Sequence, residues 1–210
     1  TQYTGNSTDL MIALHAWRSS TSIGLYRQKY PNGPLIVVLG GTDANTFLKT
    51  EPIITLRSLK HANAIVCLHT LIPDLIPPYL KHKLHIIRQS AVPLPTTRKP
   101  AIQNFDVCVI AHLRKEKDPF RAAKAARLLA PSSKIRIFHL GKAHSLKWEI
   151  MAKKEVEANF RYNWLGQVPR SRVRRELKKT NLMVISSQQE GGANVISEAI
   201  IADVPIIASD

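Results

Sequence analysis

Short runs of apolar residues, many of them β-branched, recur along the whole chain and are separated by more polar stretches. Continuous apolar runs of this length are typical of strands that are buried on both faces of a parallel sheet. The pattern predicts strands over residues 35–39, 64–68, 84–87, 107–111, 135–140, 182–186 and 205–209.

The stretches between these runs are long enough for helices. Residues 119–129 begin with proline and continue with good helix formers, and residues 171–179 and 194–202 are two further predicted helices. Strands that alternate with helices predict an α/β fold with doubly wound parallel sheets. A proline-rich, polar stretch without periodicity over residues 93–104 predicts a linker between a domain at 1–92 and a domain at 105–210.

Composition narrows the class of protein. The chain has 210 residues, a formal net charge of +15, 44% hydrophobic residues and 6% aromatic residues. The apolar content disfavours a disordered chain, and the few aromatic residues weaken the case for a base-stacking surface. No apolar stretch is long enough to span a membrane, and no signal peptide opens the chain.

The charge is spread over both halves. Residues 1–104 contain 11 basic and 4 acidic residues, a net charge of +7. Residues 105–210 contain 19 basic and 11 acidic residues, a net charge of +8. The charge is therefore not a tail, and it indicates anionic ligands or partners. Because the chain starts without Met and stops directly after a predicted strand, we expect both domains to be incomplete.

The two cysteines lie inside apolar runs. Cys67 and Cys108 are expected to be buried free thiols of a cytoplasmic protein, with a disulfide as the alternative. No spacing of Cys and His resembles a zinc site, and no Asp-x-Asp pair, Walker A loop or Gly-x-Ser-x-Gly elbow is present. We therefore expect no metal and no cofactor.

The segment 186–210 carries the most informative motif. It predicts a strand, a loop with Gly191 and Gly192, a helix and a final strand. Glu190 is expected in the loop, and Glu198 about two turns into the helix, facing back toward the loop. Two carboxylates for sugar hydroxyls, with free amides between them for phosphate, suit a nucleotide-sugar. The alternative is a surface Glu and an unrelated helix Glu.

A second motif covers residues 110–120, where a strand ends and a helix begins. Arg114, Lys115 and Lys117 lie at the position that holds the ligand crevice in open α/β sheets. Cations there can hold a diphosphate and stabilise it as it leaves. The alternative is a solvated charged turn.

Two weaker features precede them. Gly40 and Gly41 follow a strand and allow close approach of the backbone, while Asp43 can bind a hydroxyl or cap a helix. His15 follows an apolar run and is either structural or directed into a crevice. The basic run Arg170–Lys179 is a solvated helix face by default, and contact with anionic lipid or nucleic acid is the alternative.

Together these motifs resemble the GT-B glycosyltransferases of the glycosyltransferase family 4 type. Residues 112–119 are similar to the family's R-L-x-x-E-K-G segment, and residues 190–199 to its E-G-x-G-x-x-x-x-E-A segment, although His112 stands in place of the usual Arg and Asp118 in place of Gly. The resemblance implies two Rossmann-like domains that face a cleft and a UDP-sugar donor. It implies catalytic roles for His15, Asp43 and Glu190, and donor-binding roles for Gly40, Gly41, Thr42, His112, Arg114, Lys117, Gly166, Val168, Gly191, Gly192, Ala193, Asn194 and Glu198.

Eight segments along the chain are also similar to the selenosugar synthases of selenoneine biosynthesis. This resemblance implies transfer of a sugar from a UDP-sugar to selenophosphate, a small anionic acceptor. Two alternatives remain: a family 4 enzyme that acts on a lipid or polysaccharide acceptor at a membrane surface, contacted through Arg170–Lys179, and a basic nucleic-acid-binding protein. The donor sugar, the stereochemical outcome and the oligomeric state do not follow from the sequence.

Overall fold

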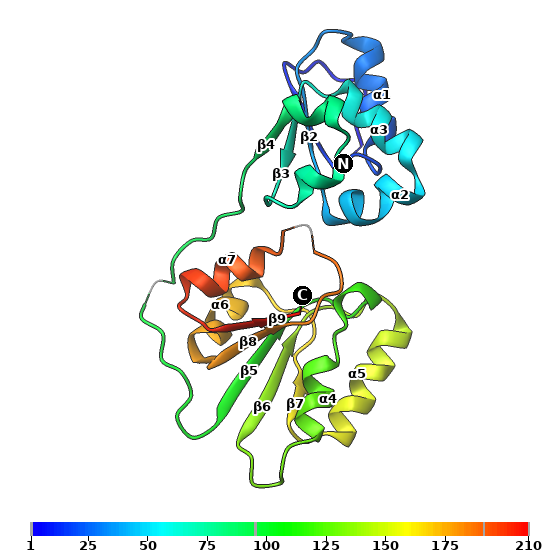
Figure 1. Cartoon of the computed structure of the whole chain (residues 1–210). Coiled ribbons are helices and arrows are strands. Elements are labelled where there is room, and N and C mark those ends of the chain that lie inside the picture. Colours follow the sequence, from blue (N-terminus) through cyan, green and yellow to red (C-terminus); the bar gives the residue numbers. More distant parts are fainter. Residues whose placement is uncertain (1, 95, 191, 210) are drawn as a thin grey trace. The chain divides into compact units, whose positions relative to one another are not determined.

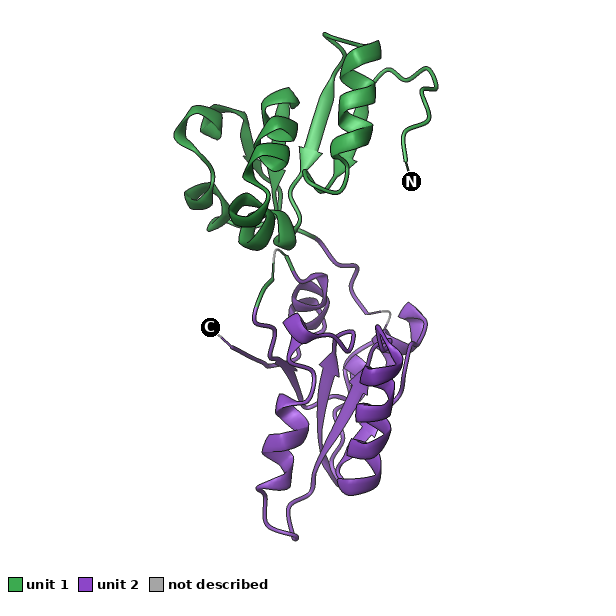
Figure 2. Cartoon of the chain, turned by 90° about the vertical axis from the view of Figure 1, so that its right-hand side faces the viewer, with its two compact units in different colours: residues 1–89, 189–192 green, residues 90–188, 193–210 purple. Residues whose placement is uncertain are grey.

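The computed structural model describes residues 2–94, 96–190 and 192–209. The chain forms two compact units (Figure 2). The first unit comprises residues 1–89 together with the short segment 189–192, and the second comprises residues 90–188 and 193–210. Each unit is built around its own parallel sheet, as the apolar runs predict.

The first unit has a four-stranded sheet in the order β1-β2-β3-β4, and all of its strand pairs are parallel. The strands are Met11–Leu14, Leu35–Val38, Ala64–Cys67 and Leu84–Ile86. The α-helices of this unit are α1 (Ser20–Lys29), α2 (Leu48–Thr50) and α3 (Pro52–His61). A π-helical turn, Asp43–Phe47, precedes α2, and the 3-10 helices Ile72–Leu75 and Pro78–Lys83 connect β3 to β4.

The second unit has a five-stranded parallel sheet in the order β7-β6-β5-β8-β9. Its strands β5 to β9 are Phe105–Ile110, Ile135–Leu140, Tyr162–Trp164, Leu182–Ile185 and Ile206–Ala208. Its helices α4 to α7 are Arg121–Arg127, Leu146–Ala158, Arg170–Lys179 and Asn194–Ile201, and a 3-10 turn covers Lys115–Lys117.

The order of the strands in the second unit reverses between β5 and β8. Right-handed crossovers then place α4 and α5 on one face of the sheet and α6 and α7 on the other, as Figure 1 shows. Two apolar clusters match these faces: one includes Val109, Ala123 and Tyr162, and the other includes Leu177 and Met183. The carboxyl ends of β5 and β8 thus form the switch point at which open α/β sheets bind ligands.

All seven predicted strands are confirmed to within two residues at each end. The helix predicted over 119–129 is shorter, because Asp118 adopts a left-handed conformation (φ 38°) and α4 begins only at Arg121. Strands β1 and β7 and helices α1, α3 and α5 were not predicted from the pattern. No helix in the described ranges is both long and apolar enough to cross a membrane.

Candidate functional site

In the first unit, His15 and Asp43 lie side by side. His15 follows β1 in a left-handed conformation (φ 69°), and its Nδ1 lies 3.1 Å from Oδ2 of Asp43. The Asp43 carboxylate is fully buried and also accepts hydrogen bonds from the backbone amides of Ala16, Trp17 and Gly40. Asp43 is therefore neither a helix cap nor a direct ligand for a hydroxyl, as the sequence had suggested, but the residue that orients His15.

Gly40 is required by the His15 ring. A Cβ at position 40 would lie 2.0 Å from Cε1 of His15, so no other residue fits without displacing the imidazole. Gly41 and Thr42 continue from Gly40 into the turn that carries Asp43. The Thr42 hydroxyl is buried, and it has no hydrogen-bond partner in the part of the chain that the structure describes.

In the second unit, the loop after β5 carries three of the predicted residues: His112, Arg114 and Lys117. Ser186, which follows β8, donates its hydroxyl to the backbone oxygen of Asp118 (2.8 Å), and the Gln188 amide donates to the Glu116 oxygen (2.8 Å). These contacts join the loops on the two sides of the switch point. The cations of the β5 loop therefore lie at the carboxyl edge of this sheet, beside the loop after β8.

The loop after β6 packs directly against the loop after β5. Leu113 donates its amide to the Lys142 oxygen (2.9 Å), the His144 amide donates to the Leu113 oxygen (3.2 Å), and Leu113 pairs with Ala143 as in a parallel sheet. A Cβ at Gly141 would lie 1.8 Å from the Ala111 oxygen, so only glycine fits this approach. Lys142 and His144 thereby join the edge, although neither was predicted.

His112 is held as a neutral hydrogen-bond donor. The Lys142 amide donates to its Nδ1 (3.1 Å), which leaves the ring proton on Nε2. Burial lowers the pKa of His112, and the charges of His144, Arg114, Lys117 and Lys142 lower it further. The positive charge at this edge therefore comes from the Arg and Lys side chains and not from His112.

A second histidine, His139, fixes the strand ends beneath these loops. It is fully buried on β6, and its Nε2 donates to the Ala111 oxygen (2.9 Å) while its Nδ1 accepts from the Tyr162 hydroxyl (2.8 Å). Burial lowers its pKa to about 4, so the ring is neutral at neutral pH. His139 thus links the ends of β5, β6 and β7.

The loop after β7 contributes Gly166 and Val168. Gly166 adopts a left-handed conformation (φ 67°), which favours glycine, and its oxygen accepts the Gly141 amide (2.8 Å). The loops after β5, β6 and β7 are therefore tied to one another in the order of their strands.

Helix α7 carries Glu198 one turn after its first residue, Asn194, and not two turns as predicted. The Glu198 carboxylate is nearly buried, and its Oε1 accepts from Arg170 (Nη2, 2.9 Å) and weakly from Asn194 (Nδ2, 3.4 Å). Ala193 precedes the helix in an extended conformation. The structure thus brings Asn194 and Glu198 together and adds Arg170 of α6 as their cationic neighbour.

Glu190 and Gly192 belong to the segment that groups with the first unit. Glu190 lies in a loop, as predicted, and its backbone oxygen accepts a hydrogen bond from Asn45 Nδ2 (3.2 Å). Gly192 has a φ of 139°, which L side chains rarely adopt. Gly191 lies outside the described residues.

The basic helix α6 is solvated along Arg172, Arg175 and Lys179, as the sequence suggested, but two of its cations also bind the chain. Arg174 donates to the oxygens of Val92 (3.0 Å) and Pro93, and Lys178 donates to the Thr96 hydroxyl. Its last carbonyls accept the amides of Lys99 and Ala101. Arg174 and Lys178 thus help to hold the segment between β4 and β5.

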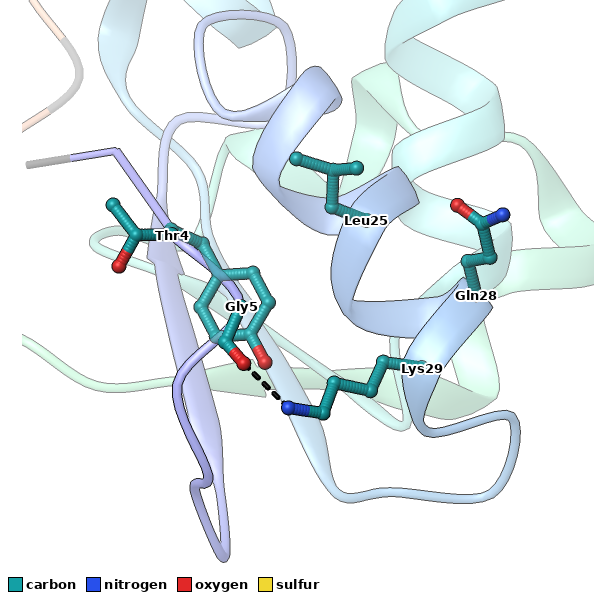
Figure 3. Close-up of a pocket in the computed structure, with 6 residues that line it drawn as sticks. Thr4, Gly5, Leu25, Gln28 and Lys29 are labelled. Atoms are coloured by element: carbon teal, nitrogen blue, oxygen red, sulfur yellow. Dashed lines mark hydrogen bonds between the residues drawn. The ribbon is translucent and has the colours of Figure 1, made fainter.

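Two further properties of the described residues bear on ligands. They contain no group of three or more His, Cys, Asp or Glu side chains that could hold a metal ion. A pocket of about 330 Å³ lies between the N-terminal segment and α1, lined by Tyr3, Leu25 and Lys29 among others (Figure 3). It contains none of the predicted site residues, and Lys29 crosses it to reach the Gly5 oxygen.

The sequence analysis did not single out Lys142 and His144, and it did not pair Arg170 with Glu198. The signal for the first two was available: they follow the predicted strand 135–140 by two and four residues, as Arg114 follows the strand 107–111 by three. The partnership of Arg170 with Glu198 joins two helices distant in sequence and leaves no local pattern.

Solved structures show the fold to which the two units belong. The crystal structure of TarM superposes with a TM-score of 0.73 at 17% identity over 95% of this chain and 40% of that chain. The crystal structure of HepE of Anabaena in complex with UDP-glucose superposes with a TM-score of 0.74 at 14% identity, over 95% of this chain and 59% of that chain. Two Rossmann-like units of this kind are the GT-B fold of glycosyltransferases.

The family follows from the sequence profile. The family described as Glycosyl transferases group 1 matches residues 98–210, more than half of the chain, and the chain belongs to it. A Xenopus tropicalis relative, Glycosyltransferase 1 domain-containing protein 1, is 24% identical over 196 residues, which are 84% of this chain and 57% of that protein. The chain thus spans less than two thirds of the length of this relative.

Proposed function

We propose that the chain transfers a sugar from a UDP-sugar to a small anionic acceptor, most specifically selenophosphate. The observation that carries the proposal is the edge of the second unit, where Arg114, Lys117 and the start of α7 lie within the segment that matches the glycosyltransferase family. The similar fold of HepE holds UDP-glucose, which supports a nucleotide-sugar as donor.

The second unit supplies the groups that a leaving UDP requires. Arg114 and Lys117 balance the negative charge that grows on the diphosphate as the bond to the sugar breaks, and the neutral His112 donates from Nε2. The amides at the start of α7 add the positive end of the helix. We propose that these groups act without a metal ion, and that Glu198 binds the ribose through the carboxylate that Arg170 orients.

His15 is the residue of the first unit that we expect to take part in the reaction. Its Nδ1 is engaged by Asp43, which leaves Nε2 on a side chain that is 32% exposed. Because selenophosphate is already an anion, it needs no strong general base. We therefore assign Nε2 to a hydroxyl of the transferred sugar, together with the carboxylate of Glu190.

The narrower acceptor rests on the resemblance of eight segments to selenosugar synthases. In that reaction a selenium lone pair attacks C1 of the sugar, the C1–Se bond forms, the bond from C1 to the diphosphate oxygen breaks, and UDP leaves with the electron pair. A basic chain steers both anions toward the protein. We further propose a cytoplasmic location, which the two buried free thiols favour.

The test measures UDP release by chromatography from a panel of UDP-sugars, with selenophosphate, with inorganic phosphate or with no acceptor, and with EDTA in a parallel series. We expect release that depends on selenophosphate and persists in EDTA. Lys117→Ala and Glu190→Ala are expected to lower turnover by about a hundredfold or more. Lys154→Ala and Glu157→Ala, exposed substitutions on α5, are the matched controls.

The outcomes separate the parts of the proposal. UDP binding without turnover of selenophosphate would withdraw the acceptor and keep the donor. Turnover that EDTA abolishes would withdraw metal independence. A folded protein that binds no UDP and turns over no UDP-sugar would overturn the whole proposal.

A further inference from the structure

We propose that Lys142 and His144, on the loop after β6, contact the phosphate groups of a nucleoside diphosphate and form a second wall of the site that Arg114 and Lys117 begin. This inference rests on the proposed function and extends it to a loop that neither motif of the sequence includes.

The two loops form one rigid strip. The pairing of Leu113 with Ala143 continues the parallel ladder of β5 and β6 past the ends of both strands. Gly141 permits this approach, and its own amide is fixed by the Gly166 oxygen (2.8 Å). Lys142 is therefore held beside His112 by backbone contacts and not by its own side chain.

The strip gathers several basic side chains, and Lys142 is one of them. Lys142 forms no ion pair with any residue in the described ranges. The buried Nε of Arg114 lacks a hydrogen-bond partner among them, and it forms only a long ion pair of 4.0 Å with Oε2 of Glu116. Like charges in one place repel one another, and Lys142 lies in the same strip as Arg114 and Lys117. A bound polyanion would relieve this repulsion.

The side chains are available to a ligand. Lys142 and His144 are both exposed, and the His144 ring lies against that of His112 with centroids 5.3 Å apart. His112 contributes an Nε2–H donor, and the ring N–H of His144 can contribute another. Two adjacent loops offer several cations and N–H donors. A diphosphate, with many oxygens and several negative charges, can engage more of these groups than a ligand with a single carboxylate can.

The experiment compares the affinity for UDP with that for uridine, by calorimetry on the full chain at neutral pH and low salt. The variants are Lys142→Gln and His144→Gln, and Lys154→Gln of α5 is the control, because it also removes one exposed charge from the same unit. We expect Lys142→Gln to weaken UDP binding about tenfold and His144→Gln about threefold, with uridine unchanged. Lys154→Gln should match the wild type.

Each outcome decides between the two proposals. If the wild type binds UDP and both variants bind it as tightly as Lys154→Gln does, this inference is overturned and the proposed function stands. Equal losses for UDP and uridine would show a role outside phosphate binding and also overturn it. If the folded wild type binds no UDP, the proposed function fails, and this inference fails with it. Thermal midpoints that match the wild type confirm that the variants are folded.

Discussion

Asp43 holds His15 through a contact of 3.1 Å between Oδ2 and Nδ1, and the same carboxylate accepts three backbone amides. One buried side chain therefore sets both the orientation of an imidazole and the path of the two loops around it. The left-handed backbone of His15 is stable only because these contacts surround it.

Asp43→Asn tests the hydrogen bonds that the Asp43 carboxylate accepts from the backbone, and His15→Gln tests its contact with the imidazole. Asparagine offers one acceptor oxygen, and its NH₂ group would face backbone donors, so at least one buried amide loses its partner. We expect a loss of roughly 2 kcal/mol in the free energy of unfolding, measured in urea. His15→Gln leaves the three amides bonded and is expected to lower turnover while changing stability by less than about 1 kcal/mol. Wild-type stability in Asp43→Asn would contradict this account.

Gly40→Ala tests the packing of the His15 ring. The new methyl group would lie 2.0 Å from Cε1, so the ring must move away from Asp43, and we expect turnover to fall at least about tenfold. Gly24→Ala is the matched control, because its Cβ meets nothing within 4 Å on α1. There we expect unchanged turnover and a gain of up to about 1 kcal/mol in stability. Equal turnover in the two variants would refute the packing argument.

Seven strands could be predicted because they are short, mainly apolar runs rich in β-branched residues, and the edge of the second unit could be predicted because its loops follow such runs directly. Strand β7 was not predicted because Tyr162–Trp164 contains no β-branched residue and has a polar residue at its centre. The role of Asp43 could not be predicted, since burial depends on contacts with residues 26 to 28 positions away. For the same reason the contacts of Arg174 on α6 could not be predicted, because its partners Val92 and Pro93 lie 82 and 81 positions earlier in the sequence.

Arg174→Ala tests the hydrogen bonds between α6 and the segment that precedes β5. Without the guanidinium, the oxygens of Val92 and Pro93 lose their donor, and the segment that leads into β5 should loosen. We expect faster hydrogen exchange at the amides of Lys99 and Ala101, which bond to the carbonyls of Lys178 and Lys179. Arg175→Ala, an exposed change on the same helix, is the control. Unchanged exchange in Arg174→Ala would show that the segment is held by its backbone alone.

His139 should make the second unit sensitive to acid. Its pKa is about 4 in the folded protein against about 6.5 in the unfolded chain, so between these values the unfolded state binds more protons. The stabilisation is complete above pH 6.5 and is lost as the pH falls, by about 3 kcal/mol at pH 4. His139→Gln should be less stable than the wild type at pH 7 but should lose about 3 kcal/mol less between pH 7 and pH 4, as measured by denaturant unfolding at both values. His61 and His112, whose pKa values are also lowered, act equally in both proteins, so the difference isolates His139. Equal losses in the two proteins would show that the imidazole does not remain neutral in the folded state.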